Sequence, residues 1–389
     1  MNFEKSVTRV TPVNIDEILQ RRRILVTCGT GGVGKTTLSA TLALRAALLG
    51  KRAVVITIDP AKRLATSLGL KSLGDHPTDL TEQLKKAAKR EVPGTFSAII
   101  PDTRKTFDQF VRTLITKEEE AERIFRNPIY QIFAREFSGA NEYMALQRLY
   151  ALDRLKEYDC IILDTPPSRN TLAFLDAPKL LARFFEDKLI QLLVLPANKL
   201  VAGGMKKALG LLSKLTGENF MTHLFDFASA LFEVRHTFAA NLKSITDLLE
   251  SQAVGFVLVA APTPQNTSEI GHFINSLTEH RFRFDGMIIN RALGYLKETQ
   301  STQTSVPLEI QDALNLIDAI SKQETLALDS LAARLTLSND GYKGQMTDQV
   351  FCAKLPELAR DIHSVEDLFH VAMVFDSAQS QLPIHFGTN

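Results

Sequence analysis

The sequence predicts an α/β fold built on a doubly wound, mostly parallel sheet, and two observations carry that prediction. Short runs of apolar and β-branched residues recur along the chain, and each run is continuous instead of alternating with polar residues. Continuous runs are typical of strands that helices cover on both faces. Segments with helical spacing separate the runs, as in folds whose strands and helices alternate. The strand-like runs are residues 24–27, 53–59, 97–100, 160–164, 255–261 and 286–290.

The first intervening helix is predicted directly after the first strand. Leu38, Leu42 and Leu48 contribute to an apolar stripe along one helix face. Gly50 follows, and glycine is the residue that most often ends a helix. We therefore expect a helix that begins near Thr36 and ends before Gly50.

Two long regions interrupt this alternation. Neither residues 104–150 nor residues 176–252 contain a strand pattern, and the second carries Leu, Phe and Met at helical spacing. We expect them to form a helical subdomain inserted into the sheet domain. The expected domains are a discontinuous sheet domain of residues 20–103, 151–175, 254–296 and 350–378, the helical subdomain of residues 104–150 and 176–252, and a helical and loop region of residues 297–349.

The composition indicates an ordinary globular protein of a reducing compartment. Lys plus Arg number 45 and Asp plus Glu number 44, so no net field would attract a nucleic acid or an anionic membrane. The three cysteines form no Cys-x-x-Cys pair, which favours a reduced interior. Residues 1–20 lack the apolar core of a secretory signal, and no apolar run approaches the roughly 18 residues of a membrane-spanning helix. We therefore expect a cytoplasmic protein that binds no nucleic acid.

The segment GTGGVGKTT lies between the first strand and the first helix, where a phosphate-binding loop belongs. It satisfies the G-x-x-x-x-G-K-[ST] pattern, in which glycines let successive backbone N–H groups turn inward around phosphate oxygens. The lysine would reach the β and γ phosphates, and the next threonine hydroxyl would ligate Mg²⁺. A dinucleotide-binding turn is the rival interpretation, but hydride chemistry does not need this Lys-Thr pair. The residues predicted to hold the nucleotide here are Gly29, Thr30, Gly31, Gly32, Val33, Gly34, Lys35, Thr36 and Thr37.

Two carboxylates end strands of the predicted sheet. Asp59 ends the second run, at the edge where open α/β sheets bind ligands, and it could orient or deprotonate an attacking water. An Asp-Pro turn without a chemical role explains Asp59 equally well. Asp164 ends the fourth run, the position of a Walker B carboxylate that holds the Mg²⁺ water shell. The expected catalytic residues are Lys35, Asp59 and Asp164, and the expected Mg²⁺ ligands are Thr36, Asp59 and Asp164.

Together, these motifs resemble the ArsA and tail-anchored-protein-targeting ATPase family, whose relatives include the ParA and MinD partition ATPases. The resemblance rests on GTGGVGKTT, TIDPAKRLATSLGL, FSGANEYMALQRL, DTPPSRNTLAFLDAP and GMIINRAL, which span most of residues 22–295. KLPELARDIHSVEDL near the C-terminus is a looser match. DTPPSRN and GTGGVGKTT are most similar to a bacterial branch of anion-transporting ATPases, often encoded as paired paralogues. The resemblance implies that the sheet domain is a P-loop ATPase domain that binds ATP.

The resemblance also implies roles for individual residues. Asp59 would position water in a first switch loop, and Asp164 would begin a second. Asn290 would read the adenine base, although a strand-end cap explains this residue without the resemblance. Pro356 lies in a segment that loosely matches a loop flanking adenine.

The sequence departs from the family pattern in three places. The family's loop usually has a second lysine after its first glycine, which reaches the phosphates of a dimer partner, whereas Thr30 stands here. Lys62, Arg63 or Arg169 could substitute, a partner subunit could donate the charge, or hydrolysis is slow. DTPPSRNTLAFL replaces the usual DTAPTGHTLRFL, which puts coupling to a client in question. The cysteine spacing offers neither a zinc clamp between subunits nor an arsenite-binding thiolate cluster.

These observations favour a Mg²⁺-dependent ATPase that works as a dimer and whose hydrolysis switches the helical subdomain between conformations. Residues 176–252 could offer an apolar groove to a hydrophobic client or a membrane protein, although a Met and Phe stripe is more often ordinary core. A weakly hydrolytic subunit of a heterodimer with a paralogous ATPase is the main alternative. A positioning ATPase similar to MinD or ParA is another, which the charge balance does not encourage.

Overall fold

The computed structural model consists of two compact units. One comprises Met1–Ile100, Leu152–Leu172 and Leu249–Asn389 and contains a sheet. The other comprises Pro101–Ala151 and Ala173–Leu248, and its described part is helical. The residues that the structure describes are 14–57, 63–115, 117–136, 140–165, 218–292, 315–316, 318–324, 326, 351–358 and 361–378.

The sheet has eight strands in the order β3-β4-β2-β5-β1-β6-β7-β8. Neighbouring strands are parallel except β3 and β4, which are antiparallel. This arrangement confirms the predicted α/β fold with a mostly parallel sheet. The strands are β1 (Ile24–Cys28), β2 (Arg52–Thr57), β3 (Thr78–Asp79), β4 (Thr95–Ile99), β5 (Cys160–Asp164), β6 (Val254–Ala260), β7 (Phe284–Ala292) and β8 (Phe351–Pro356).

The strand register brings three strands to an end at the same level. Thr27 of β1 and Thr57 of β2 are both register partners of Asp164 at the end of β5. Because these strands are parallel, their carboxyl ends share one edge of the sheet. The register alone therefore surrounds Asp164 with two threonines.

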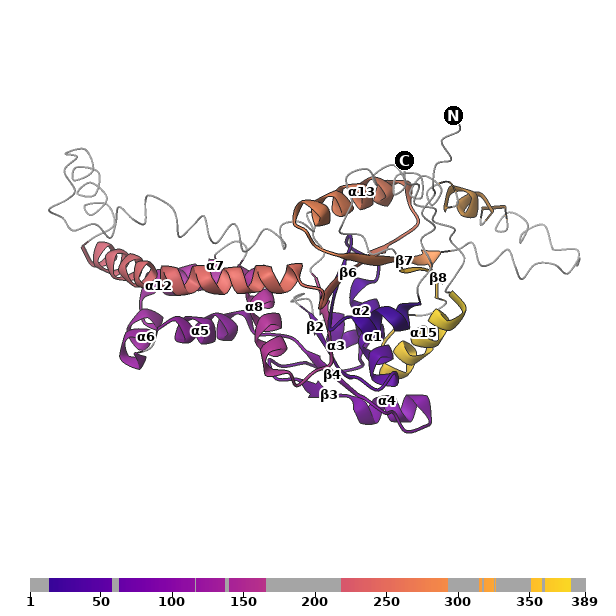
Figure 1. Ribbon diagram of the computed structural model, residues 1–389, viewed down its shortest axis with the longest axis horizontal. Coiled ribbons are helices and arrows are strands. Elements are labelled where there is room, and N and C mark those ends of the chain that lie inside the picture. The colour runs from indigo at the N-terminus through magenta and orange to yellow at the C-terminus, as the bar shows by residue number, and fades with distance from the viewer. Residues whose placement is uncertain are drawn as a thin grey trace, which may run out of the picture. The chain divides into compact units, whose positions relative to one another are not determined.

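The central strands are buried along their whole length because helices cover them. Every residue of β1, β5 and β6 is buried. Helices α1, α2 and α15 share a hydrophobic core with the sheet, and α13 packs against β6 on the side away from α2 (Figure 1). The helices of this unit are α1 (Ile15–Arg21), α2 (Lys35–Leu48), α3 (Arg63–Ser67), α4 (Thr81–Ala88), α13 (Pro264–Glu279) and α15 (Val365–Ala378).

The buried guanidinium of Arg45 ties α1 and α15 to α2. Its Nε donates a hydrogen bond to Asp16 of α1. In α15, its Nη1 donates to the Ala372 carbonyl and its Nη2 to Asp376, both at 2.5 Å. Since α2 begins at the end of the glycine-rich loop, these bonds hold the helix that carries the loop.

The predicted end of α2 at Gly50 is confirmed. The last helical residue is Leu48, and Gly50 has a φ of +91°, a backbone conformation that favours glycine. Its N–H donates a 3.0 Å hydrogen bond to the Ala47 carbonyl and so pairs one of the helix's last carbonyls.

Five helices form the described part of the second unit, with an aromatic core. Phe107 stacks on Tyr130 with ring centroids 5.6 Å apart, and Phe110 meets Phe238 edge-on at 5.4 Å. The helices are α5 (Thr103–Leu114), α6 (Glu118–Phe125), α7 (Pro128–Glu136), α8 (Ala140–Leu155) and α12 (Glu218–Glu250).

None of the helices in the described ranges is long and apolar enough to cross a membrane.

The Met and Phe stripe of α12 is part of this core. Met221, Phe227 and Phe238 are each less than 10% exposed. For these three residues the structure favours the core interpretation over an open client groove. The rest of the predicted groove region, residues 176–217, lies outside the described residues.

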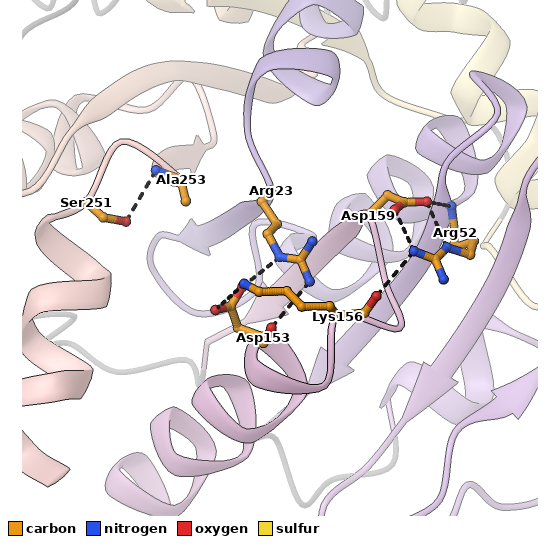
Figure 2. A network of polar contacts seen from close by, with 7 residues as sticks. All are labelled: Arg23, Arg52, Asp153, Lys156, Asp159, Ser251 and Ala253. Atoms are coloured by element: carbon orange, nitrogen blue, oxygen red, sulfur yellow. Dashed lines mark hydrogen bonds and ion pairs between the residues drawn. The ribbon is translucent and has the colours of Figure 1, made fainter.

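Ion pairs join the amino end of the sheet to the turn between α8 and β5 (Figure 2). Arg23, directly before β1, donates a 2.6 Å hydrogen bond to Asp153, which also pairs with Lys156 at 3.0 Å. Arg52 at the start of β2 pairs with Asp159 at 2.8 Å and donates to the Lys156 carbonyl at 3.2 Å. These contacts hold the backbone turn at Lys156, where φ is +56°, against two strands.

Candidate functional site

The loop between β1 and α2 requires glycine at two positions. Gly29 and Gly34 have φ values of +149° and +88°. A Cβ at Gly29 would lie 2.1 Å from the Val259 carbonyl oxygen, and one at Gly34 would lie 2.5 Å from Asn290 Nδ2. Both glycines therefore combine an unusual backbone conformation with close packing.

Lys35 lies inside this loop and is only 5% exposed. Its Nζ donates hydrogen bonds to the carbonyls of Gly29 at 2.8 Å and Thr30 at 2.6 Å. The ammonium group is thereby held within the turn that the glycines create, so its charge is directed at the interior of the loop.

Asp164 is fully buried at the end of β5 and accepts hydrogen bonds from hydroxyl groups. Thr57 donates to it at 2.7 Å and Ser39 at 3.3 Å, and the Thr36 hydroxyl is a further partner. Burial raises the pKa of Asp164 to about 6, against the lowering effect of these hydrogen bonds and of the Lys35 charge. The sheet therefore keeps a carboxylate with a perturbed pKa directly beside the loop.

A chain of hydroxyl groups fixes this corner of the sheet. Thr27 and Ser39 are joined through their hydroxyl oxygens at 2.6 Å. The single hydroxyl proton of Ser39 serves two acceptors, the Lys35 carbonyl at 2.7 Å and Asp164 at 3.3 Å. Thr165 donates from its Oγ1 to the Thr27 carbonyl at 2.8 Å. The motifs did not predict these supporting residues; the only signal for Ser39 is its position one helical turn after Lys35.

A cavity of about 390 Å³ opens beside the loop. One side of its lining comes from the loop and the start of α2, and another from α3. A third comes from the segment between β8 and α15. This segment packs closely against Gly69, two residues after α3, because a Cβ at Gly69 would lie 2.7 Å from the His363 carbonyl oxygen. The lining residues are Gly32, Gly34, Lys35, Thr36, Thr37, Arg63, Thr66, Ser67, Thr165, Asp361, Ile362 and His363.

Half of the residues that line this cavity were not predicted as site residues. Thr66, Ser67 and the segment 361–363 belong to no phosphate-binding motif, and the segment lies more than 300 residues after the loop. Arg63 is one of the three expected substitutes for the missing loop lysine, and it lines the cavity with an exposed side chain.

Of the two residues expected near the adenine base, Asn290 contacts the glycine-rich loop and Pro356 does not line the cavity. Asn290 Nδ2 donates a 2.9 Å hydrogen bond to the Val33 carbonyl, so β7 contacts the loop directly. Pro356 is the register partner of Ala292 at the end of the neighbouring strand, outside the cavity lining given above.

Three of the residues discussed for the site fall outside the described part of the chain. They are Asp59, the expected water-positioning carboxylate, and Lys62 and Arg169, two of the candidate cations.

The donors beside the loop fit a hard divalent cation. The Thr36 hydroxyl and the Asp164 carboxylate are oxygen ligands of the kind that Mg²⁺ prefers, and they are hydrogen-bonded to each other. The cysteines do not offer a comparable metal site. Cys28 and Cys160 are buried near opposite ends of adjacent strands, and burial raises the pKa of each thiol to about 12. Protonated thiols are poor metal ligands.

Comparison with known proteins identifies the family. Residues 22–320 match the family described as anion-transporting ATPase. A protein of Aquifex aeolicus named as an arsenical pump-driving ATPase is 25% identical over 328 residues, which cover 79% of this chain and 96% of that protein.

Two eukaryotic relatives are also ATPases by name. ATPase ASNA1 homolog 1 of Paramecium tetraurelia is 28% identical over 268 residues, covering 68% of this chain and 73% of that protein. ATPase get3 of Schizosaccharomyces pombe is 27% identical over 179 residues, or 44% of this chain and 49% of the relative. The resemblance inferred from the motifs is thus confirmed. Since the family match spans about three quarters of its length, this chain belongs to the anion-transporting ATPase family and is an ATP-hydrolysing enzyme.

Proposed function

We propose that this chain binds ATP together with Mg²⁺ in the loop of residues 29–37 and hydrolyses it there. The observation that carries the proposal is the meeting of Lys35, Thr36 and Asp164 at the carboxyl edge of the sheet, beside a cavity of about 390 Å³. A buried cation, a hydroxyl and a carboxylate at this edge are the parts that phosphoryl transfer uses.

The phosphates would be held mainly by the backbone. N–H groups of the glycine-rich turn and of the first turn of α2 favour anions, and the helix dipole adds to the attraction. Lys35 would turn from the carbonyls of Gly29 and Thr30 toward the β and γ phosphates. Little side-chain reorganisation is needed, because its ammonium group already lies within the loop.

Thr36 and Asp164 would hold Mg²⁺, with Asp59 as the expected third ligand. The bound cation would neutralise charge on the β and γ phosphates. Asp59 would orient the attacking water in line with the γ phosphate, and hydroxyl groups such as Thr57 would keep Asp164 in place. In-line attack needs positioned reactants and positive charge more than covalent help.

Arg63 is the described residue best suited to supply further positive charge to the transferred phosphate. It lines the same cavity as Lys35 and Thr36, and its side chain is exposed there. A guanidinium stabilises the charge of the phosphoryl transition state. This would compensate within one subunit for the threonine at position 30, which cannot supply a charge.

We further propose that the protein works as a dimer whose nucleotide state sets the conformation of the helical subdomain of residues 104–150 and 176–252. Asn290 and Pro356 would flank the adenine base. The motion would act on a hydrophobic client or a membrane protein, in line with relatives that are named for driving an arsenical pump. The division of the chain into a sheet unit and a helical unit supports such coupling.

Binding and turnover measured side by side test the proposal. We expect Lys35→Ala to lose both Mg²⁺-dependent ATP binding and phosphate release. Asp59→Asn should keep binding and lose turnover, because it removes only the group that positions water. Equal turnover in Asp59→Asn would remove that residue from the mechanism.

Thr30 favours one second candidate, a weakly hydrolytic subunit of a heterodimer with a paralogous ATPase. Mass measurement with and without ATP, on the protein alone and mixed with such a paralogue, separates the two. An ATP-dependent homodimer that releases phosphate supports the first proposal, whereas a silent chain that becomes active only in the mixture supports the second.

A further inference from the structure

The hydrogen bond from Asn290 to the loop involves a peptide unit that faces the nucleotide cavity. Asn290 Nδ2 donates to the carbonyl of Val33 at 2.9 Å. That carbonyl and the N–H of Gly34 belong to one peptide group. Since the described chain has no cis peptide bonds, the C=O and N–H of this group point in opposite directions. Holding the carbonyl therefore sets the direction of the Gly34 N–H.

The Gly34 N–H therefore points away from Asn290. Gly34 lines the cavity, whereas Asn290 is not among the lining residues, so a phosphate in the cavity would meet this N–H from the side opposite Asn290. The next carbonyl is also fixed, because the Leu38 N–H donates to Gly34 O at 3.0 Å. The Val33 side chain is 4% exposed and anchors the unit in the core.

Glycine at position 34 makes this contact possible. A Cβ there would lie 2.5 Å from Asn290 Nδ2, too close for the amide to remain in place. The loop thus needs Gly34 for its left-handed backbone and also for the approach of Asn290.

The strand pairing is interrupted at Asn290. The register of β7 and β8 shifts between Ile289 and Ala292, and Arg291 in that interval has a φ of +65°. Such bulges re-aim side chains next to functional sites. The Arg291 guanidinium also pairs with both carboxylate oxygens of Glu357, at 2.7 and 2.9 Å.

We propose that Asn290 is a positioning residue of the phosphate cradle: by holding the Val33 carbonyl, it orients the Gly34 N–H toward the polyphosphate. The inference rests on the proposed function of the loop and adds a role that does not depend on the base. A residue that only reads adenine would affect nucleotides alone, whereas a positioning residue also affects a polyphosphate that has no base.

Calorimetric binding of MgATP, MgGTP and magnesium tripolyphosphate to the full chain and its variants tests this inference. Asn290→Ala should weaken tripolyphosphate binding roughly two- to tenfold, the effect of one hydrogen bond, and should weaken ATP at least as much. Asn290→Asp should weaken all three ligands more, because a carboxylate repels the Val33 carbonyl. Lys35→Ala is the background control: any binding that it retains does not depend on the loop lysine.

Asn127→Ala is a matched control, since Asn127 Nδ2 also donates a 2.9 Å hydrogen bond to a main-chain carbonyl, that of His223. It lies in the helical unit and should leave all three affinities unchanged even if the melting temperature falls. Unchanged tripolyphosphate binding in Asn290→Ala, with or without a loss for ATP, would overturn the inference. A wild-type chain that binds none of the ligands would instead overturn the proposed function.

Discussion

The aspartates at the amino and carboxyl ends of the parallel strands have different partners. At the amino edge, arginines meet aspartates directly: Arg22 donates to both oxygens of Asp285 at 2.6 and 2.7 Å, and Arg52 pairs with Asp159 at 2.8 Å. At the carboxyl edge, the fully buried Asp164 accepts hydrogen bonds from hydroxyl groups. A cavity opens at the carboxyl edge, next to the glycine-rich loop.

We interpret this difference as one between residues that hold the fold and residues that serve the proposed nucleotide site. Arg22 and Asp285 are almost fully buried and neutralise each other, and Gly255 leaves room for that carboxylate because a Cβ there would lie 1.8 Å from Asp285 Oδ2. Asp164 has no such bidentate partner among the contacts described, and burial raises its pKa to about 6. Perturbed carboxylates of this kind are concentrated at functional sites.

The largest expected effect is on turnover at the carboxyl edge. Lys35→Ala should reduce phosphate release on the order of 10³-fold or more, because the transferred phosphate loses its nearest cation. The melting temperature should change little, since the hydrogen bonds described for Lys35 run to carbonyls of its own loop. Turnover and melting curves recorded on the same preparation check both statements, and a variant that unfolds would place Lys35 among the residues that hold the fold.

Asp164→Asn should lose turnover while the protein keeps its stability. The amide fits the same space and can still accept from Thr57, and it no longer leaves an ionised carboxylate in a buried position. We expect a melting temperature in metal-free buffer at least as high as that of the wild type. A variant with normal phosphate release would remove Asp164 from the site, and a large drop in melting temperature would show that the carboxylate is structural.

The amino edge should give the reverse pattern. Asp285→Ala leaves the buried Arg22 guanidinium unpaired, which should cost about 3–5 kcal/mol of stability. Activity per folded molecule should be unchanged, because the pair lies at the opposite edge from the cavity. Denaturant unfolding and an active-fraction assay measure the two quantities. The double substitution Arg22→Met with Asp285→Leu should recover most of the stability; no recovery would contradict this explanation.

The smallest expected effect concerns an exposed ion pair. Hydrogen bonds from Arg52 lower the pKa of Asp159 to about 2, so the pair stabilises the fold above the ordinary carboxyl pKa near 4 and this contribution is lost as the pH falls toward 2. Arg52→Gln should therefore lower the melting temperature slightly at pH 7 and by clearly less near pH 2. A difference that is as large at pH 2 as at pH 7 would rule out the ion pair as its cause.

The sequence predicted the parts of the fold that local patterns determine. All six apolar runs became strands, with boundaries within about two residues, because continuous burial leaves a continuous apolar signal. β8 was missed because it is an edge strand whose residues alternate between buried and half-buried. β3 was missed because two residues are too short to leave a pattern.

The site divides in the same way. Lys35 and Thr36 follow from a contiguous motif, and Asp164 follows from the end of a strand, so their grouping was predictable. The contact of Asn290 with Val33 joins residues 257 positions apart and depends on a bulge that sequence periodicity does not show. The segment 361–363 joins the cavity through close packing against Gly69, which is a tertiary contact without a local signal.

The most direct test of the central claim is calorimetric titration of ATP into the purified chain, with and without Mg²⁺, alongside Lys35→Ala. We expect binding to the wild type that Mg²⁺ strengthens and that the substitution abolishes. A wild-type chain that takes up no ATP in the presence of Mg²⁺, or a Lys35→Ala variant that binds it equally well, would contradict the assignment of the loop as the nucleotide site.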